Sequence, residues 1–164
     1  MKKSSSTAAL AAAAVRTAPS SALVEALQLV LADTYSLMGL THLAHWNVEG
    51  PGFFSLHAAF EAQYNALFAA ADEIAERIRA LGAYAIGGLK TLGAHSGLEE
   101  FKAPLSQRDY VAALVAANEK TIADLAQART LSEKAGDLET QDLMIGRIQE
   151  HQKTVWMLKS FLKD

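Results

Sequence analysis

Four side chains in this sequence have the types and spacing of metal ligands. His45 and His57 stand on either side of a glycine–proline break, and Asp72 and Glu76 stand one helical turn apart in the segment ADEIAER. Imidazole and carboxylate donors together suit iron, with zinc, manganese and cobalt as competitors. The chain has no cysteine, which excludes disulfides and thiolate metal sites. A metal site requires elements that bring these four side chains together.

The elements available are four long segments with helical periodicity. A composition rich in alanine and leucine, with three prolines, favours helices over strands. We expect helices over about 21–46 and 53–81, a third that begins after Ser106 as its N-cap, and a fourth that ends at about Phe161. A domain of this kind, over 22–164, is large enough to bury a core.

Three breaks separate these segments. The first, at 48–52, contains Gly-Pro-Gly, and the last is predicted over 134–142. A long connection, 82–105, joins the second and third helices, and its SGLEEF segment (96–101) is the candidate for a short helix. Two hairpins joined by one long crossover are the ferritin-like version of an all-α four-helix bundle. Other bundles of four helices remain open at this point, since fold alone does not determine function.

The usual di-iron site inside such a bundle needs Glu-x-x-His pairs, which place a carboxylate and an imidazole on one helix face. None of the five histidines in this chain has a glutamate three residues before it. The sequence therefore excludes an intrabundle centre of that design.

The four candidate ligands fit a site between two chains. Asp72 and Glu76 point about 130° and about 170° away from the apolar stripe of their helix, where a solvent-exposed outer face is the ordinary alternative. The helix from His57 to Asp72 spans about 22 Å, so these two side chains cannot share an ion bound at about 2 Å. If two copies of the helix pack antiparallel across a two-fold axis, His57 of one chain and Asp72 of the other can share an ion, with His45 as the second nitrogen ligand. An isologous interface then creates two identical sites.

The motif HWNVEGPGFFSLH, followed by AADEIAERIRALG and later by TQDLMIGRIQEHQKTVWMLKSFL, resembles the Dps proteins, or miniferritins, from about residue 23 to 162. The resemblance implies a shell of twelve subunits with ferroxidase centres between subunits. In this family iron(II) is oxidised, mainly by hydrogen peroxide, and is stored inside the shell as ferric mineral. The implied benefit is protection of DNA from oxidative damage.

The resemblance also implies roles for individual residues. It matches the ferroxidase ligands to two histidines and two acids, His45, His57, Asp72 and Glu76. Glu61 falls at a second, weaker iron position, and Trp46 at a tryptophan beside the centre, for which a core aromatic at a helix end is the ordinary alternative. Asp137 and Asp142 match acids that line a three-fold iron entry pore, although a helix start favours the same acids through its dipole.

The first 21 residues are expected to form a flexible, weakly basic arm. They hold Lys2, Lys3 and Arg16, whereas all 18 acidic side chains follow them. The expected partners are further copies of the chain and, through this arm, non-specific DNA in salt-sensitive contacts; a solubilising tail is the alternative. No run reaches the roughly 18 apolar residues of a membrane span, so we expect a soluble protein without membrane contact. The start, MKKSSSTAALAAAAV, resembles a signal peptide but lacks a centre rich in Leu, Val or Phe, so we expect a cytoplasmic protein rather than a secreted one. The competing function is a nucleoid-compacting or structural oligomer without ferroxidase activity.

Overall fold

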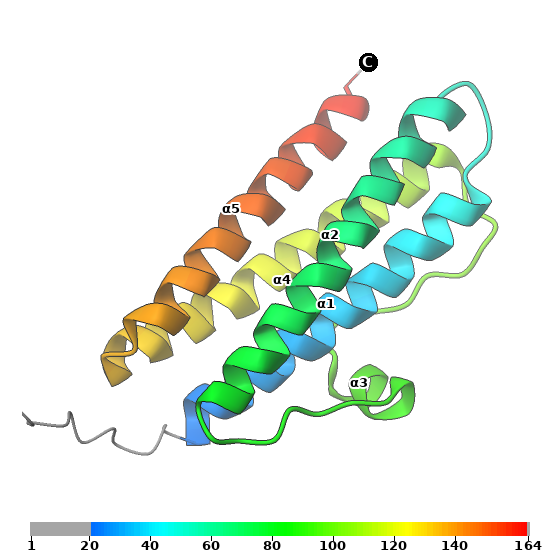
Figure 1. Cartoon of the computed structure of the whole chain (residues 1–164). Coiled ribbons are helices and arrows are strands. Elements are labelled where there is room, and N and C mark those ends of the chain that lie inside the picture. Colours follow the sequence, from blue (N-terminus) through cyan, green and yellow to red (C-terminus); the bar gives the residue numbers. More distant parts are fainter. Residues whose placement is uncertain (1–20, 164) are drawn as a thin grey trace, which may run out of the picture.

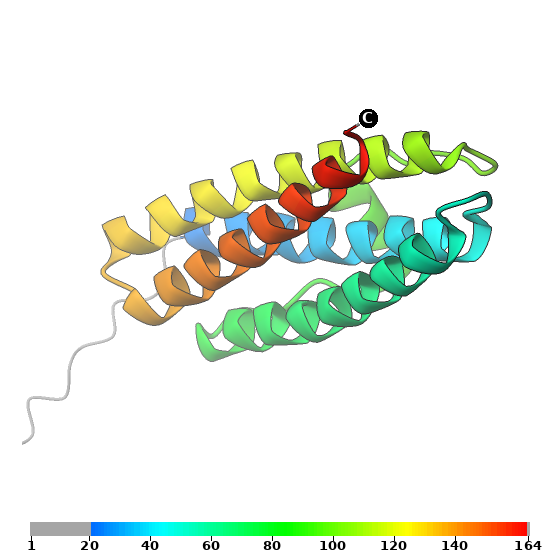
Figure 2. The same ribbon diagram turned by 90° about the horizontal axis from the view of Figure 1, so that it is seen from above.

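The computed structural model describes residues 21–163, and within them every regular element is an α-helix. Two hairpins build the bundle, and the crossover between them holds one short helix (Figure 1). The elements are α1 (Ser21–Asn47), α2 (Phe53–Ala80), α3 (Leu89–His95), α4 (Gln107–Ala135) and α5 (Leu138–Phe161). α1 packs along α2 and α4 along α5, and Figure 2 shows the same pairing from above. The predicted four-helix bundle with a long crossover is confirmed, while the arm predicted over 1–21 lies outside the described residues apart from Ser21.

The short helix of the crossover lies one segment earlier than predicted. It forms at Leu89–His95, and the SGLEEF segment after it has no regular secondary structure. A tertiary contact with α1 explains why no helix forms at SGLEEF. One carboxylate oxygen of Asp33 accepts hydrogen bonds from the Ser96 hydroxyl at 2.8 Å and from the Gly97 N–H at 2.7 Å. These donors are therefore committed to α1 and do not begin a helix of their own.

The predicted N-cap of α4 is confirmed. The Ser106 hydroxyl oxygen accepts a hydrogen bond from the Asp109 N–H at 3.1 Å.

The break between α4 and α5 is shorter than the predicted 134–142. Gly136 ends α4 in the left-handed conformation with φ of 67°, and Asp137 already caps α5. Two local caps placed back to back leave no room for a longer loop.

The apolar stripe predicted on α2 is buried. Phe60, Ile74 and Ile78 have no exposed surface. The core forms two apolar clusters along the bundle, one around Ile74 and Leu92 of α3, and the other around Phe60 and Tyr110 of α4. The second cluster lies beneath the α1–α2 hairpin and fixes the two helix ends that carry the histidines.

By length and composition alone, α1 is apolar enough to cross a membrane. However, 56% of its most apolar window is buried inside the bundle, where α1 packs against α2 and α4. A core helix has this combination of apolar sequence and burial, so packing in the bundle accounts for the composition of α1.

Candidate metal centre

His45 and His57 lie face to face across the α1–α2 turn. Their rings are stacked, with centroids 3.7 Å apart and an interplanar angle of 19°. Nδ1 of His45 bonds to the backbone oxygen of His57 at 2.9 Å, and Nδ1 of His57 bonds to the backbone oxygen of His45 at the same distance. Because a carbonyl oxygen only accepts, each Nδ1 carries the hydrogen, and each neutral ring keeps its lone pair on Nε2. The hairpin therefore fixes two imidazoles in the tautomer that binds a metal through Nε2.

This pairing follows from where the two helices end. His45 is in the last turn of α1 and His57 in the second turn of α2, and only 48–52 separate the helices. Val48 holds the turn against the core, because only 1% of its surface is exposed. Gly50 adopts a φ of 105°, a conformation open mainly to glycine. The sequence predicted the proximity of the two rings, but the reciprocal hydrogen bonds are visible only in the structure.

Aromatic rings surround the pair. His42 lies one turn before His45, with its ring centroid 4.1 Å from that of Trp46 and 4.2 Å from that of Tyr64. Tyr64 also meets His45 edge-on at 5.3 Å. Trp46 is 65% exposed, so within one chain it is not the core aromatic that was the alternative interpretation. Tyr64 was not predicted as a residue of the site, although its position two helical turns after His57 is a signal that places it there.

The two carboxylates lie on the same helix as His57 but far from it. Asp72 and Glu76 are exposed, and α2 runs without interruption through His57 and both of them. The rise of a helix then separates His57 from Asp72 by about 22 Å. Glu61 is also exposed, one turn after His57 and at the same end of α2 as the imidazole pair. Within 21–163, one chain places no group of three or more His, Asp or Glu side chains around a single point.

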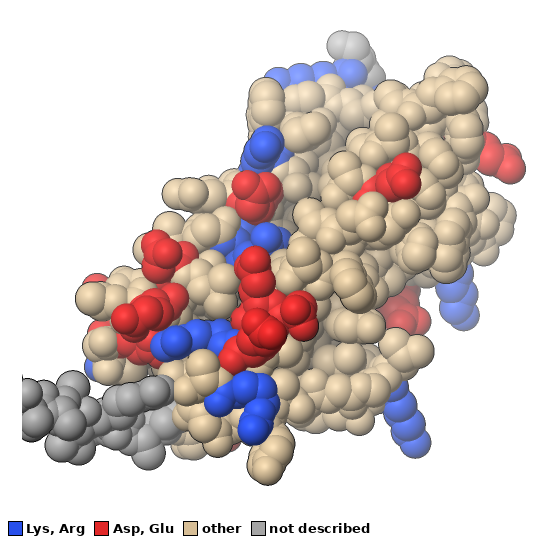
Figure 3. Space-filling model, viewed as in Figure 1, with Lys and Arg blue, Asp and Glu red and all other residues tan. Residues whose placement is uncertain are grey.

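The charge distribution separates the same two regions. On the face of Figure 3, acidic side chains gather toward the lower end of the molecule, whereas the upper right, over the α1–α2 turn, is mostly uncharged. On this face, therefore, acidic side chains are more numerous at the end of the molecule away from the α1–α2 turn.

Asp137 has a structural role at the start of α5. Its carboxylate accepts hydrogen bonds from the Thr140 N–H and hydroxyl, at 3.0 and 2.6 Å, and pairs with Arg77 of α2 at 2.6 Å. Burial alone would raise the pKa of Asp137, but the bonds from Thr140 and the charge of Arg77 outweigh it and lower the pKa. Asp142, the other acid matched to the entry pore, is exposed on α5.

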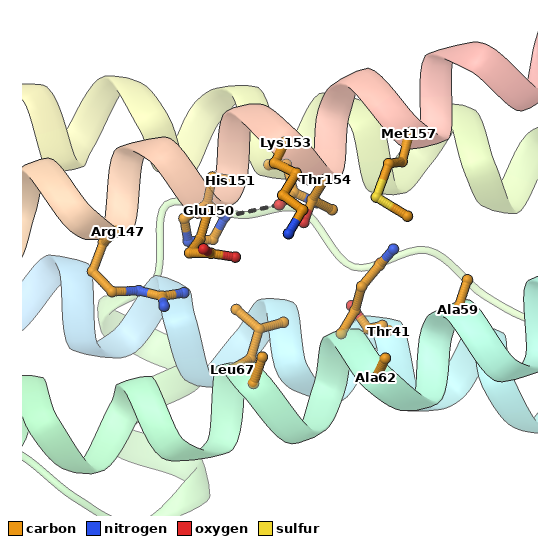
Figure 4. A pocket seen from close by; sticks show the side chains of 13 residues that line it. Thr41, Ala59, Ala62, Leu67, Arg147, Glu150, His151, Lys153, Thr154 and Met157 are labelled. Atoms are coloured by element: carbon orange, nitrogen blue, oxygen red, sulfur yellow. Dashed lines mark hydrogen bonds between the residues drawn. The ribbon is translucent and has the colours of Figure 1, made fainter.

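A cavity of about 240 Å³ opens between α2 and α5, with His151 among its lining residues (Figure 4). His151 is 2% exposed, and its Nδ1 bonds to Asn118 Oδ1 at 2.8 Å. The Asn118 amide nitrogen donates to the Leu114 carbonyl, so Oδ1 is the acceptor and His151 Nδ1 the donor. Burial and the charge of Arg147 lower the pKa of His151 to about 3. This single imidazole beside a guanidinium is a poor place for a cation.

The chain matches the family model of the ferritin-like domain over residues 24–164. An uncharacterised low temperature-induced protein of Nostoc sp. is 38% identical over 138 residues, which cover 81% of this chain and 75% of that protein. The DNA protection during starvation protein 2 of Bacillus anthracis is 33% identical over 141 residues, covering 86% of this chain and 97% of the relative.

Solved structures show the same similarity. The crystal structure of Dps from Staphylococcus aureus superposes with a TM-score of 0.86 at 32% identity, over 90% of this chain and 99% of that chain. The Dps protein of Vibrio cholerae, described as a member of a broad superfamily of ferritin-like diiron-carboxylate proteins, gives a TM-score of 0.83 at 33% identity, over 86% and 89% of the two chains.

Proposed function

The chain belongs to the Dps family of ferritin-like proteins, whose members store iron and protect DNA, and we propose that it is a ferroxidase that takes Fe(II) as substrate at sites between subunits. Hydrogen peroxide is the preferred oxidant, and ferric mineral accumulates inside a hollow shell. The proposal rests on the imidazole pair. Hydrogen bonds at Nδ1 orient the rings of His45 and His57 and leave Nε2 of each ring to bind a metal.

The site is completed by a second copy of the chain. His45 and His57 bind Fe(II) through nitrogen, and Asp72 and Glu76 of the neighbouring copy bind it through oxygen, because the length of α2 prevents one chain from supplying both halves. Glu61, on the histidine side, serves a second and weaker iron position. Zinc and other divalent ions compete for this mixed nitrogen and oxygen donor set.

The reaction is a two-electron reduction of peroxide by two ferrous ions. Each Fe(II) gives one electron, the O–O bond breaks, and two protons convert the oxygen atoms to two water molecules. The protein positions the ions and keeps coordination positions open for the oxidant. Trp46, exposed beside the histidine pair, is available to be oxidised in place of other molecules. Consuming peroxide together with Fe(II) suppresses formation of hydroxyl radicals.

The assembly proposed is the twelve-subunit shell of the family, in the cytoplasm. Asp137 and Asp142 are proposed to lie near a three-fold pore, where a ring of carboxylates raises the local Fe(II) concentration. Twelve copies of the arm with Lys2, Lys3 and Arg16 give multivalent, non-specific DNA contacts and association with the nucleoid. A gel-shift assay at low salt tests this part, and absence of retardation there would contradict DNA binding.

The alternative is a structural or nucleoid-compacting oligomer without ferroxidase activity. Stopped-flow measurement of Fe(II) oxidation by peroxide decides between the two, with the double variant His57→Ala/Asp72→Ala and native mass to verify assembly. We expect the fast phase to disappear in this variant and to persist in His95→Ala, which removes an exposed histidine of α3. Unchanged oxidation in an assembled double variant would contradict ferroxidase function at this site.

A further inference from the structure

The α1–α2 turn is tied to the start of α4 by one side chain. The backbone N–H of Gly52 donates a hydrogen bond of 3.0 Å to Oε1 of Gln107, the first residue of α4. Gly52 is the N-cap residue of α2 and has no side chain to accept a bond from the first turn. Gln107 thus satisfies, from another helix, a donor that α2 itself leaves unpaired.

The turn is shaped to receive this glutamine. A Cβ atom at Gly50 would lie 2.6 Å from Gln107 Nε2, and a Cβ atom at Gly52 would collide with Gln107 Oε1. Phe161 of α5 closes the other side, 3.1 Å from the same Cβ position of Gly52. Both glycines therefore permit a close approach between the turn and the amide of Gln107.

The fixed turn controls the geometry of the imidazole pair. Each ring of His45 and His57 is oriented by the backbone carbonyl of the other, so both orientations depend on how the end of α1 lies against the start of α2. A shift of the first turn of α2 would lengthen both bonds together. Free rings would then rotate and exchange tautomers, and the two Nε2 lone pairs would no longer have fixed directions.

We infer that Gln107 is a positioning residue for the metal centre, whose amide oxygen holds the hairpin so that His45 and His57 present Nε2 in fixed directions at the centre. This inference rests on the proposed function, because it assumes that the pair binds metal. It assigns a role at the centre to a residue 50 positions after His57 that does not touch the metal itself.

The test uses Co(II) as probe on the assembled protein, with affinity measured by titration against a chelator and geometry by the visible absorption of bound Co(II). Gln107→Leu keeps the volume but removes the acceptor, and we expect Co(II) affinity to fall about tenfold, the lower end of the effect of losing an outer hydrogen-bond partner of a ligand. Gln107→Glu keeps an acceptor oxygen and should restore both affinity and spectrum.

Gln28 offers a matched control at the opposite end of the bundle. Its amide donates to the Tyr84 carbonyl at 2.7 Å and accepts from the Ile86 N–H at 3.0 Å, so Gln28→Leu also removes side-chain bonds to a connecting segment. We expect Gln28→Leu to lower the melting temperature while leaving Co(II) binding unchanged. If Gln107→Leu does not assemble, Gln107→Asn replaces it, because the shorter amide cannot reach Gly52.

The outcomes separate this inference from the proposed function. Weaker binding in Gln107→Leu or Gln107→Asn, rescue by Gln107→Glu and normal binding in Gln28→Leu support the inference. Wild-type affinity in the Gln107 variants, or equal loss in Gln28→Leu, overturns it while leaving the ferroxidase proposal intact. A wild-type protein that neither binds Co(II) nor oxidises Fe(II) with peroxide overturns both.

Discussion

The His45–His57 pair and His151 use the same hydrogen-bonding device in different surroundings. At all three rings Nδ1 donates to an oxygen that is fixed as an acceptor, which leaves the lone pair on Nε2. The pair has two such lone pairs, on two stacked rings at the end of a hairpin. His151 has one, 2% exposed, and shares its cavity with Arg147.

The surroundings decide whether a histidine with a fixed tautomer can serve as a metal ligand. A locked tautomer provides a donor atom, but a metal ion also needs a second donor within reach and no competing cation beside it. The pair meets both conditions once carboxylates from another copy are added. His151 meets neither, and the charge of Arg147 helps to lower its pKa to about 3, so it acts as a neutral core residue.

The largest expected effect is on catalysis. His57→Gln should slow Fe(II) oxidation by peroxide more than about a hundredfold, since even the outer partners of metal ligands are worth about 10–100-fold. His151→Gln should keep nearly the wild-type rate. Initial rates of Fe(III) absorbance measure both, and a comparable loss in the two variants would erase the distinction between ligand and core histidine.

The effect on stability should be larger at His151 than at His57, the reverse of the effect on catalysis. His151→Ala leaves Asn118 Oδ1 buried without its donor, and about 1–3 kcal/mol of unfolding free energy should be lost. His57→Ala should cost less, because His57 is only half-buried. Thermal unfolding at one protein concentration compares them, and a lower melting temperature in His57→Ala than in His151→Ala would show that the pair is mainly structural.

The fold was predictable wherever local sequence decided it. The periodic apolar stripe of α2 and the Ser106 cap gave correct elements because each depends on nearby residues. The crossover helix was misplaced because Asp33, more than sixty residues earlier in the chain, captures Ser96 and Gly97. A contact of this kind has no local signature in the sequence.

The site was predictable in part for the same reason. The spacing of His45 and His57 across a short turn indicates that they meet, and the length of a helix separates them from Asp72. The reciprocal ring-to-backbone bonds, the ring of Tyr64 and the ion pair of Asp137 with Arg77 depend on tertiary packing. The inter-subunit half of the site remains a prediction, because one chain does not contain it.

His151 and Asp33 should change the stability of the fold in opposite directions as the pH falls. His151 has a folded pKa of about 3, below its ordinary 6.5, so its contribution to stability is complete above about pH 6.5 and declines as the pH falls. Asp33 behaves oppositely. Burial and the neighbouring carboxyl group of Asp124 raise its pKa from 3.8 to about 6, so the folded state takes up the proton first and gains stability as the pH falls through 6.

Between about pH 4 and pH 6 the two slopes, each at most about 1.4 kcal/mol per pH unit, should nearly cancel in the wild type. In Asp33→Asn only the His151 slope remains, so stability should fall as the pH is lowered. In His151→Gln only the Asp33 slope remains, so stability should rise as the pH is lowered. Urea unfolding across this range measures both slopes. Parallel pH profiles for the two variants would contradict the assignment.

The smallest expected effect distinguishes the N-cap residue Asp137 from Asp142 of α5, because one substitution should lower stability and the other should slow iron uptake. Asp137→Ala removes an N-cap and an ion pair and should cost about 1 kcal/mol of stability. Asp142→Asn should leave the melting temperature unchanged and slow Fe(II) uptake at low ionic strength, an effect that added salt removes. Slower uptake without loss of stability in Asp137→Ala would instead assign the pore role to that residue.

We propose that each metal centre takes its imidazoles from one chain and its carboxylates from another. Complementation tests it directly, by co-expressing His45→Ala/His57→Ala subunits with Asp72→Ala/Glu76→Ala subunits and measuring peroxide-dependent Fe(II) oxidation in the mixed assembly. Neither parent should be active alone. A two-fold interface between unlike subunits contains one intact site of two, so random mixing should restore about a quarter of the wild-type activity. No activity in a mixed assembly of verified composition would contradict the shared site.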